Sequence, residues 1–284
     1  MGRFTVRDSV GGFRVIDLGQ QHLVRIFNGN FEKGGRLYRG FWLQMGGRMR
    51  ACLRINGEAV YEYDFSACHI RLLYAAIGVP CLPKPYQIHG FESARGIVKH
   101  ATLVMINASS EGAARKAVVR KMREKGIPGG EAYASQMMAA IKTRLPEIEQ
   151  FWYRGVGKQL QRCDSDIMIR CLTELLDQQI VGLPVHDSIV VQKQHEQTLI
   201  EVMDRIFETE GEVIAIQLLS HLANKPRRDR RRAGIRNQDL TATTATRETK
   251  TSGICKHDLT VMEERVDGLV DQPSASSVPV NFSS

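Results

Sequence analysis

Two largely apolar segments, ACLRI and EAVYEYDF, flank the pair Asn56-Gly57. Residues 51–55 and 58–65 therefore predict two β-strands. Asn-Gly favours a type I′ turn, because both central residues of that turn need a positive φ. We expect an antiparallel hairpin at this point of the chain.

After the hairpin, apolar residues recur mostly at three- and four-residue spacing, the period of an amphipathic helix. Ser66 predicts the N-cap of the first helix, and Gly126 predicts the end of the third. The expected helices cover residues 67–77, 93–107, 111–125, 131–144, 146–161, 165–180 and 195–210.

A further pair of strands is expected within Leu183–Gln192, which reads LPVHDSIVVQ. Apolar and β-branched residues flank His186-Asp187-Ser188, as in two strands that meet at a tight polar turn. Together with the hairpin, this segment predicts an α/β (α+β) fold with an antiparallel sheet accompanied by helices.

The chain divides into three regions by composition. Residues 1–25 show no clear cap or repeat and are interpreted as an N-terminal stump, whereas residues 26–222 hold the predicted strands and helices. The run KPRRDRRR at residues 225–232 is followed by a Thr- and Ser-containing stretch with few aromatic residues. This composition predicts a basic, disordered tail over residues 223–284.

The charge balance favours a polyanionic partner. The 284 residues include 39 Lys and Arg against 31 Asp and Glu, a formal net charge of +8. The six cysteines form no CxxC pair or Cys/His cluster, so nothing indicates a zinc site or a disulfide framework. No stretch approaches the roughly 18 continuous apolar residues of a membrane span. We therefore expect a cytoplasmic protein with no membrane partner.

Two aspartates stand where the predicted strands end. Asp64 closes a hairpin strand, and Asp187 lies in a turn between apolar segments, where a buried carboxylate is costly unless a cation or hydrogen bonds compensate. On adjacent strands, the two would hold two Mg²⁺ ions roughly 3.5 to 4 Å apart, an arrangement that serves phosphoryl transfer. Taken singly, each aspartate is more typical of a cap or a turn. The pair His186-Asp187 also occurs in metal phosphohydrolases.

One face of the helix expected over residues 93–107 carries Arg95, Lys99, Leu103 and Asn107 at four-residue spacing. This face presents two cations, then an apolar surface, then an amide. A triphosphate can lie across the cations while a base stacks on the later residues. The alternative is a pair of ordinary surface cations.

Five short motifs, in this order, resemble those of family A DNA polymerases. Residues 63–71 (YDFSACHIR) resemble motif A, Arg95 with Lys99 resembles the start of motif B, and residues 185–188 (VHDS) resemble motif C. Residues 32–36 (EKGGR) are similar to the T/DxxGR element, and Gln161 with Asp166 matches QxxxxD. The resemblance spans residues 31–192.

The resemblance implies the palm of a polymerase right hand, with an antiparallel sheet and helical fingers, but no full thumb and no exonuclease domain. The implied function is template-directed nucleotide addition, foremost DNA-directed DNA polymerase activity in replication or repair in a phage- or plasmid-like element. The implied partners are a DNA template-primer, nucleoside triphosphates and an additional protein that would supply the thumb or processivity function.

The resemblance also implies a role for each matched residue. Asp64, Asp187 and the backbone carbonyl of Phe65 would bind two Mg²⁺ ions, for which Mn²⁺ can substitute. Arg95 and Lys99 would bind the triphosphate, with Lys99 neutralising the leaving pyrophosphate. The remaining nucleotide contacts would be Leu103, Asn107 and His69. Template or primer contacts would be Arg36, Gln161 and His186, with Arg71 supporting the site.

Two departures leave the sugar and the template open. His69 stands where DNA polymerases of this family carry a glutamate that screens the sugar, and Asn107-Ala108 replaces a Tyr-Gly pair. The His-Asp-Ser form of motif C is equally similar to single-subunit phage-type RNA polymerases. The alternatives are therefore a DNA-dependent RNA polymerase or primase-like enzyme, a catalytically inactive nucleic-acid-binding remnant, and a metal phosphohydrolase built around His186-Asp187.

Overall fold

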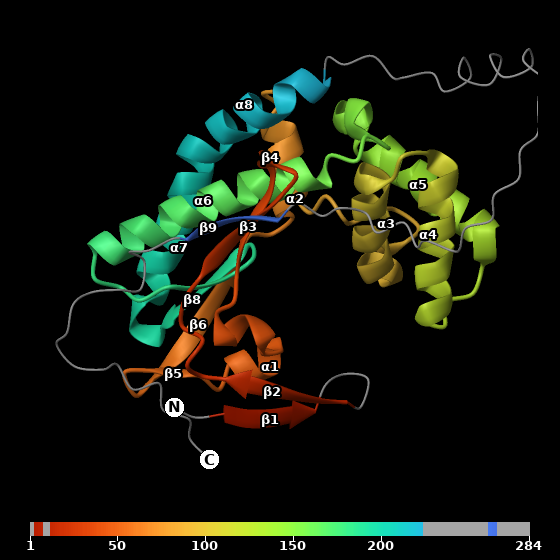
Figure 1. Cartoon of the computed structure of the whole chain (residues 1–284). Coiled ribbons are helices and arrows are strands. Elements are labelled where there is room, and N and C mark those ends of the chain that lie inside the picture. The colour runs from red at the N-terminus through yellow and green to blue at the C-terminus, as the bar shows by residue number, and fades with distance from the viewer. Residues whose placement is uncertain (1–2, 8–11, 224–260, 266–284) are drawn as a thin grey trace, which may run out of the picture.

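The structure, a computed structural model, describes residues 3–7, 12–223 and 261–265. Within these residues it combines small antiparallel sheets with α-helices, so the predicted α+β class is confirmed (Figure 1). No helix in the described part of the chain is both long enough and apolar enough to cross a membrane.

A four-stranded antiparallel sheet brings the two predicted strand pairs together. Its order is β5 (Arg54–Ile55), β6 (Glu58–Asp64), β8 (Ser188–Gln192) and β7 (Leu183–Val185). Asn56 and Gly57 have φ values of 53° and 81°, which confirms the predicted hairpin turn. The central pair aligns Asp64 with Ser188, so segments more than 120 residues apart in sequence meet at one end of the sheet.

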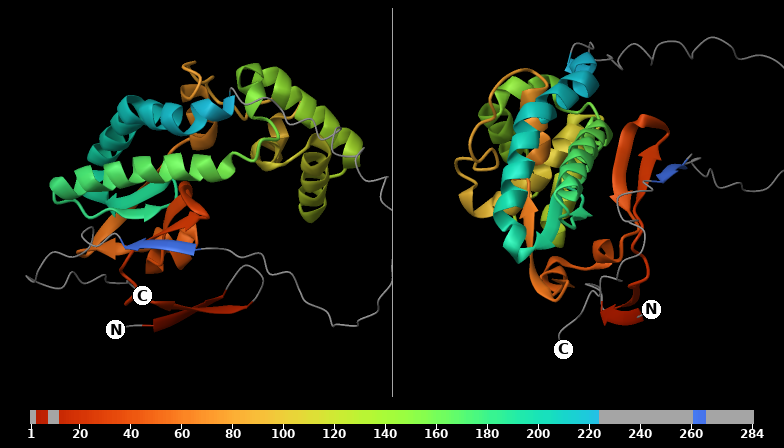
Figure 2. Two further views of the ribbon diagram at one scale, coloured as in Figure 1. Left: turned by 45° about the horizontal axis from the view of Figure 1, so that its top comes forward. Right: turned by 90° about the vertical axis from the view of Figure 1, so that its left-hand side faces the viewer.

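Two further sheets come from the first 38 residues. β1 (Arg3–Arg7) and β2 (Phe13–Asp17) form a hairpin, and β3 (Val24–Asn28) pairs with β4 (Asn30–Tyr38). Figure 2 shows β3 and β4 standing beside the helices in its right-hand view. The segment interpreted as a stump, residues 1–25, thus contains the first hairpin and the start of β3.

One segment of the tail is a strand. β9 (Val261–Arg265) pairs antiparallel with the free edge of β3, because an unpaired strand edge offers backbone groups to another strand. These five residues depart from the disorder expected over residues 223–284. Residues 224–260 and 266–284 lie outside the described part of the chain.

The helices form two groups (Figure 1). In one group, α3 (Arg95–Asn107), α4 (Glu111–Glu124) and α5 (Gly130–Arg144) pack against one another. The second group contains α2 (Cys68–Ala75), α6 (Gly157–Asp177), α7 (Glu196–Ile206) and α8 (Glu212–Ala223). α7 covers β6 and β8, and α6 lies along β4. The short helix α1 (Gly47–Arg50) precedes β5.

Several local predictions were wrong. The strand expected over residues 51–55 covers only Arg54–Ile55, and the break expected between residues 161 and 165 lies inside the continuous α6. Ser66 does not cap α2, because Ala67 occupies the N-cap in the left-handed conformation (φ 55°) without a side-chain hydrogen bond. The helix expected over 146–161 is broken: a 3₁₀ helix covers Pro146–Phe151, and α6 begins only at Gly157. Between them the backbone turns at two positive φ values, 61° at Tyr153 and 68° at Gly155.

Candidate active site

The two aspartates predicted to hold metal lie at the same end of adjacent strands. Asp64 is the last residue of β6, and Asp187 lies in the turn between β7 and β8, next to the Ser188 that pairs with Asp64. The backbone N–H of Phe65 donates to the carbonyl of Asp187 at 3.2 Å and joins the two segments beyond the last strand pair. His186 takes a positive φ of 59°, which lets the turn close. We call Asp64 and Asp187 the aspartate pair.

The surroundings of Asp64 disfavour its negative charge. The pKa of Asp64 is raised to about 6, chiefly by desolvation and then by the negative charge of Asp187. Lys99 acts in the opposite direction, while Glu62 adds to the rise. The Asp64 side chain nevertheless remains open to solvent. The site therefore favours an additional positive charge that can be approached from water.

The donors of the aspartate pair fit a hard divalent cation. Among the described residues, no three His, Cys, Asp or Glu side chains converge as a metal cage. Mg²⁺ usually takes one or two carboxylates and completes its shell with water and substrate phosphates. Two carboxylates at a solvent-open edge match that pattern.

The predicted face of α3 is free to receive a ligand. Arg95, Lys99 and Asn107 are exposed and Leu103 is half-buried, and we call these four residues the substrate face. The opposite side of the helix packs into the core through Val98, Ala101, Thr102 and Met105. The influence of Lys99 on the pKa of Asp64 links the substrate face to the aspartate pair.

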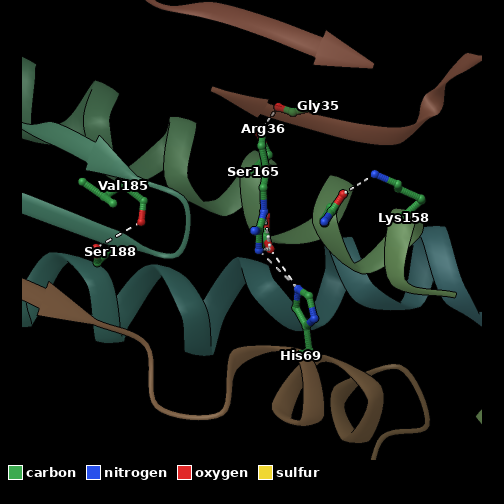
Figure 3. Close-up of polar contacts among 9 residues, drawn as sticks. Gly35, Arg36, His69, Lys158, Ser165, Val185 and Ser188 are labelled. Carbon is green, nitrogen blue, oxygen red and sulfur yellow. Dashed lines mark hydrogen bonds and ion pairs between the residues drawn. The ribbon is translucent and has the colours of Figure 1, made fainter. Parts of the chain in front are cut away.

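Arg36 and His69 are held together by a buried acid that the sequence pattern did not indicate. Asp164 on α6 has only 1% of its side chain exposed, and its carboxylate lies 3.2 Å from Arg36 Nε and 3.0 Å from His69 Nε2. Arg36 also bonds to Asp164 through Nη2. Figure 3 shows Arg36 of β4 and His69 of α2 pointing toward each other. We call these three residues the Asp164 cluster.

The Asp164 cluster keeps Arg36 charged beside the aspartate pair. Burial acts to lower the pKa of Arg36, but the hydrogen bond and charge of Asp164 outweigh it and leave the pKa raised, with a further contribution from Asp187. The contacts expected between Arg36 or His69 and nucleic acid or nucleotide stay predictions. Both side chains already have a protein partner.

The other predicted contact residues are more dispersed. Gln161 accepts a hydrogen bond from Lys158 at 3.2 Å on the first turns of α6. His186 is exposed, and its pKa is lowered by partial desolvation and then by Arg36. Arg71 stacks on the ring of Phe207 at 3.8 Å, and buried Phe65 packs on the same ring. Arg71 and Phe65 thus both pack on Phe207.

Glu62 is a second residue that the sequence pattern did not bring out. Its carboxylate accepts from the Ser188 hydroxyl at 2.8 Å and from Arg50 at 2.8 and 3.1 Å. It lies two residues before Asp64 on the same face of β6, as strand alternation requires. The network therefore fixes the alignment of β6 and β8 where the aspartate pair lies.

No protein-family model, curated protein or solved structure matches this chain. The residues of the site are therefore the basis for a functional proposal. A pattern clue to Asp164 does exist: the buried stripe of α6, which includes Leu160, Cys163, Ile167 and Met168, is interrupted by this one carboxylate. No such clue marks Glu62, whose role depends on a partner 126 residues away.

Proposed function

We propose that this chain is a template-directed nucleotidyltransferase with a palm built on β5–β8 and fingers formed by α3–α5. The observation that carries the proposal is the shared strand end that brings Asp64 beside Asp187, and the raised pKa of Asp64, which Lys99 opposes, agrees with it. Two carboxylates at one strand end, with Lys99 of α3 close enough to oppose the pKa rise of Asp64, match the needs of a triphosphate that loses pyrophosphate.

Each group has a distinct task in this reaction. Mg²⁺ bound by the aspartate pair would supply charge neutralisation at the reacting phosphate and promote deprotonation of the attacking hydroxyl. Arg95 and Lys99, exposed on α3, would bind the triphosphate oxygens and balance the charge that moves to the leaving group. Leu103 and Asn107, further along the same face, would contact the sugar and base.

The preferred substrate is a DNA template-primer with deoxynucleoside triphosphates. RNA synthesis is the close alternative, because His69 is held by Asp164 at 3.0 Å and no glutamate occupies that position. A primer-extension assay with labelled dNTPs and rNTPs on DNA and RNA templates separates the two. We expect Mg²⁺-dependent incorporation with at least one of these combinations.

The control is the double variant Asp64→Ala, Asp187→Ala. Wild-type incorporation no greater than that of this variant, on every template, would contradict the proposal. Salt-sensitive nucleic-acid binding without incorporation would instead identify a non-catalytic binding protein. Nucleotide hydrolysis that needs no template would identify a metal phosphohydrolase.

A further inference from the structure

A row of cations follows the solvent face of α4. Lys116, Arg120 and Arg123 are exposed there, whereas the opposite face of the helix is buried against α3 and α5. None of the three forms an ion pair with another described residue. We call these three residues the α4 stripe.

Other cations of α4 do have acidic partners. Arg115 lies 3.6 Å from Glu131 of α5, and Lys121 pairs with Glu124 at 2.9 Å. The α4 stripe therefore holds the cations of α4 that have no acidic side chain within ion-pair distance among the described residues.

The spacing of the α4 stripe suits a row of phosphates. With a helical rise of about 1.5 Å per residue, Lys116 and Arg120 are separated by about 6 Å along the axis, and Arg120 and Arg123 by about 4.5 Å. These steps are similar to the separation of neighbouring phosphates in an extended nucleic-acid strand. Lys binds phosphate as a point charge, and Arg adds a bidentate fork.

The surface around the α4 stripe offers no apolar anchor. The exposed large hydrophobic residues of the described chain lie on other elements: Phe13, Val15, Phe31, Val79, Val181, Val213 and Ile216. Protein interfaces and interfacial membrane helices both rely on buried aromatic or aliphatic side chains. A purely ionic surface fits a polyanionic backbone better.

The α4 stripe lies on a helix that packs against α3, the helix of the substrate face. His100, one residue beyond Lys99, is half-buried at the boundary between the two helices. Its pKa is lowered by desolvation and then by the nearby charges of Lys121 and Arg120. The substrate face and the α4 stripe therefore belong to the same group of packed helices.

We propose that the α4 stripe binds the phosphates of the single-stranded template ahead of the site of nucleotide addition. The proposal rests on the proposed function, because only a templated reaction leaves a single strand beside the substrate face. The contacts are to phosphate, so DNA and RNA templates are expected to behave alike.

Binding of labelled oligonucleotides, followed by fluorescence anisotropy over a range of salt concentrations, tests this proposal. The ligands are a primer-template with a long 5′ template overhang and the same duplex with blunt ends. In the variant Lys116→Gln, Arg120→Gln, Arg123→Gln, the slope of log K against log salt for the overhang ligand should fall by about 2, at about 0.7 per lost single-strand contact. That corresponds to a loss of affinity on the order of 100-fold at 0.1 M salt. Binding of the blunt duplex should be unchanged.

A matched control removes the same charge elsewhere. Arg14, Arg48 and Lys84 are also exposed, and their joint replacement by Gln should leave the overhang preference intact. Equal losses in the two triple variants, or an equal loss for blunt and overhang ligands, would overturn the proposal. If circular dichroism shows that the α4 triple variant is unfolded, Arg120→Gln alone should weaken overhang binding about fivefold at 0.1 M salt. An unchanged affinity would overturn the proposal.

The binding test of the α4 stripe can fail or succeed independently of the test of the proposed function. A chain that incorporates no nucleotide, yet loses single-strand binding when the α4 stripe is neutralised, would contradict the polymerase function alone. A chain that extends primers but binds the overhang equally well without the α4 stripe would contradict this inference alone.

Discussion

Asp64 ends a strand in surroundings that disfavour its own charge. Desolvation and the negative charges of Asp187 and Glu62 raise its pKa, and Lys99 offsets only part of the rise. Such unrelieved repulsion lowers stability and is common where a protein prepares a site for a cation.

Asp64→Asn should therefore stabilise the metal-free protein above pH 6. The folded pKa of about 6 exceeds the unfolded value of 3.8, so the folded state binds protons more readily and loses stability as pH rises between these values. We expect a gain of about 1 kcal/mol at pH 7.5, after discounting for solvent screening, and none below pH 4. Urea unfolding of wild type and variant at both pH values measures this difference in the free energy of unfolding. Equal or lower stability of the variant at pH 7.5 would show that the carboxylate is not strained.

Asp164 has the opposite character, because it is bonded to the side chains of Arg36 and His69. Replacing it by Asn leaves Arg36, 15% exposed, without its partner and should destabilise the fold by about 3 kcal/mol. Glu196→Gln is the control, since its partner Lys193 is 60% exposed and the loss should stay below about 0.5 kcal/mol. The double variant Arg36→Met, Asp164→Leu should recover much of the loss, because no unpaired charge remains. Equal losses of stability in Asp164→Asn and Glu196→Gln would contradict the stabilising role of the Asp164 cluster.

At the scale of residues, sequence reasoning succeeded where the chemistry is local. Asn56-Gly57 specifies its turn through φ values alone, and the four-residue spacing from Arg95 to Asn107 correctly placed those side chains on one side of a helix. It missed Asp164, because the partners of that carboxylate come from β4 and α2, which are distant in sequence.

At the scale of elements, the least regular part of the site is the contact between the end of α3 and the turn that precedes α6. The N–H of Gly155 donates to the carbonyl of Ile106 at 3.0 Å, so the turn after the 3₁₀ helix is tied to the end of α3. A Cβ added at Gly157 would overlap the amide of Asn107. The sequence predicted a continuous helix here because the apolar spacing continues, whereas these contacts with α3 impose the break.

The contact between Asn107 and Gly157 can be tested by non-additivity. Gly157→Ala should cost about 1 kcal/mol and displace the Asn107 amide from the substrate face, since the overlap cannot be relieved otherwise. Asn107→Ala should remove most of that cost in the double variant. Thermal unfolding of the two single variants and the double variant measures the coupling free energy between Asn107 and Gly157. Additive losses would show that the two residues do not constrain each other.

At the scale of the whole molecule, the site joins segments from nearly the whole described chain. β6, β8 and the Asp164 cluster come from between residues 30 and 192, and Lys99 of α3 acts on the same site through its charge. Sequence patterns indicated the α+β class and most elements, but neither the β1–β2 sheet nor the sheet of β4, β3 and β9. β1–β3 lack a strong local signal, and β9 is defined by pairing with a distant edge.

Divalent metal should stabilise the intact site as a whole. Binding to the folded state alone adds about 1.4 kcal/mol at ten times the dissociation constant. We expect Mg²⁺ to raise the melting temperature of wild type, EDTA to reverse the rise, and the variant Asp64→Asn, Asp187→Asn to respond no more than to NaCl of equal ionic strength. An equal Mg²⁺ response in wild type and this variant would place any metal elsewhere.

The central claim is that Asp64 and Asp187 act as one catalytic unit, and single-turnover primer extension tests it most directly. Wild type should incorporate nucleotide in Mg²⁺, while Asp64→Asn, Asp187→Asn and the double variant should all fall to the same residual rate, because groups that act together are not additive. Circular dichroism would verify that each variant is folded. Extension by either single variant at the wild-type rate would contradict the claim.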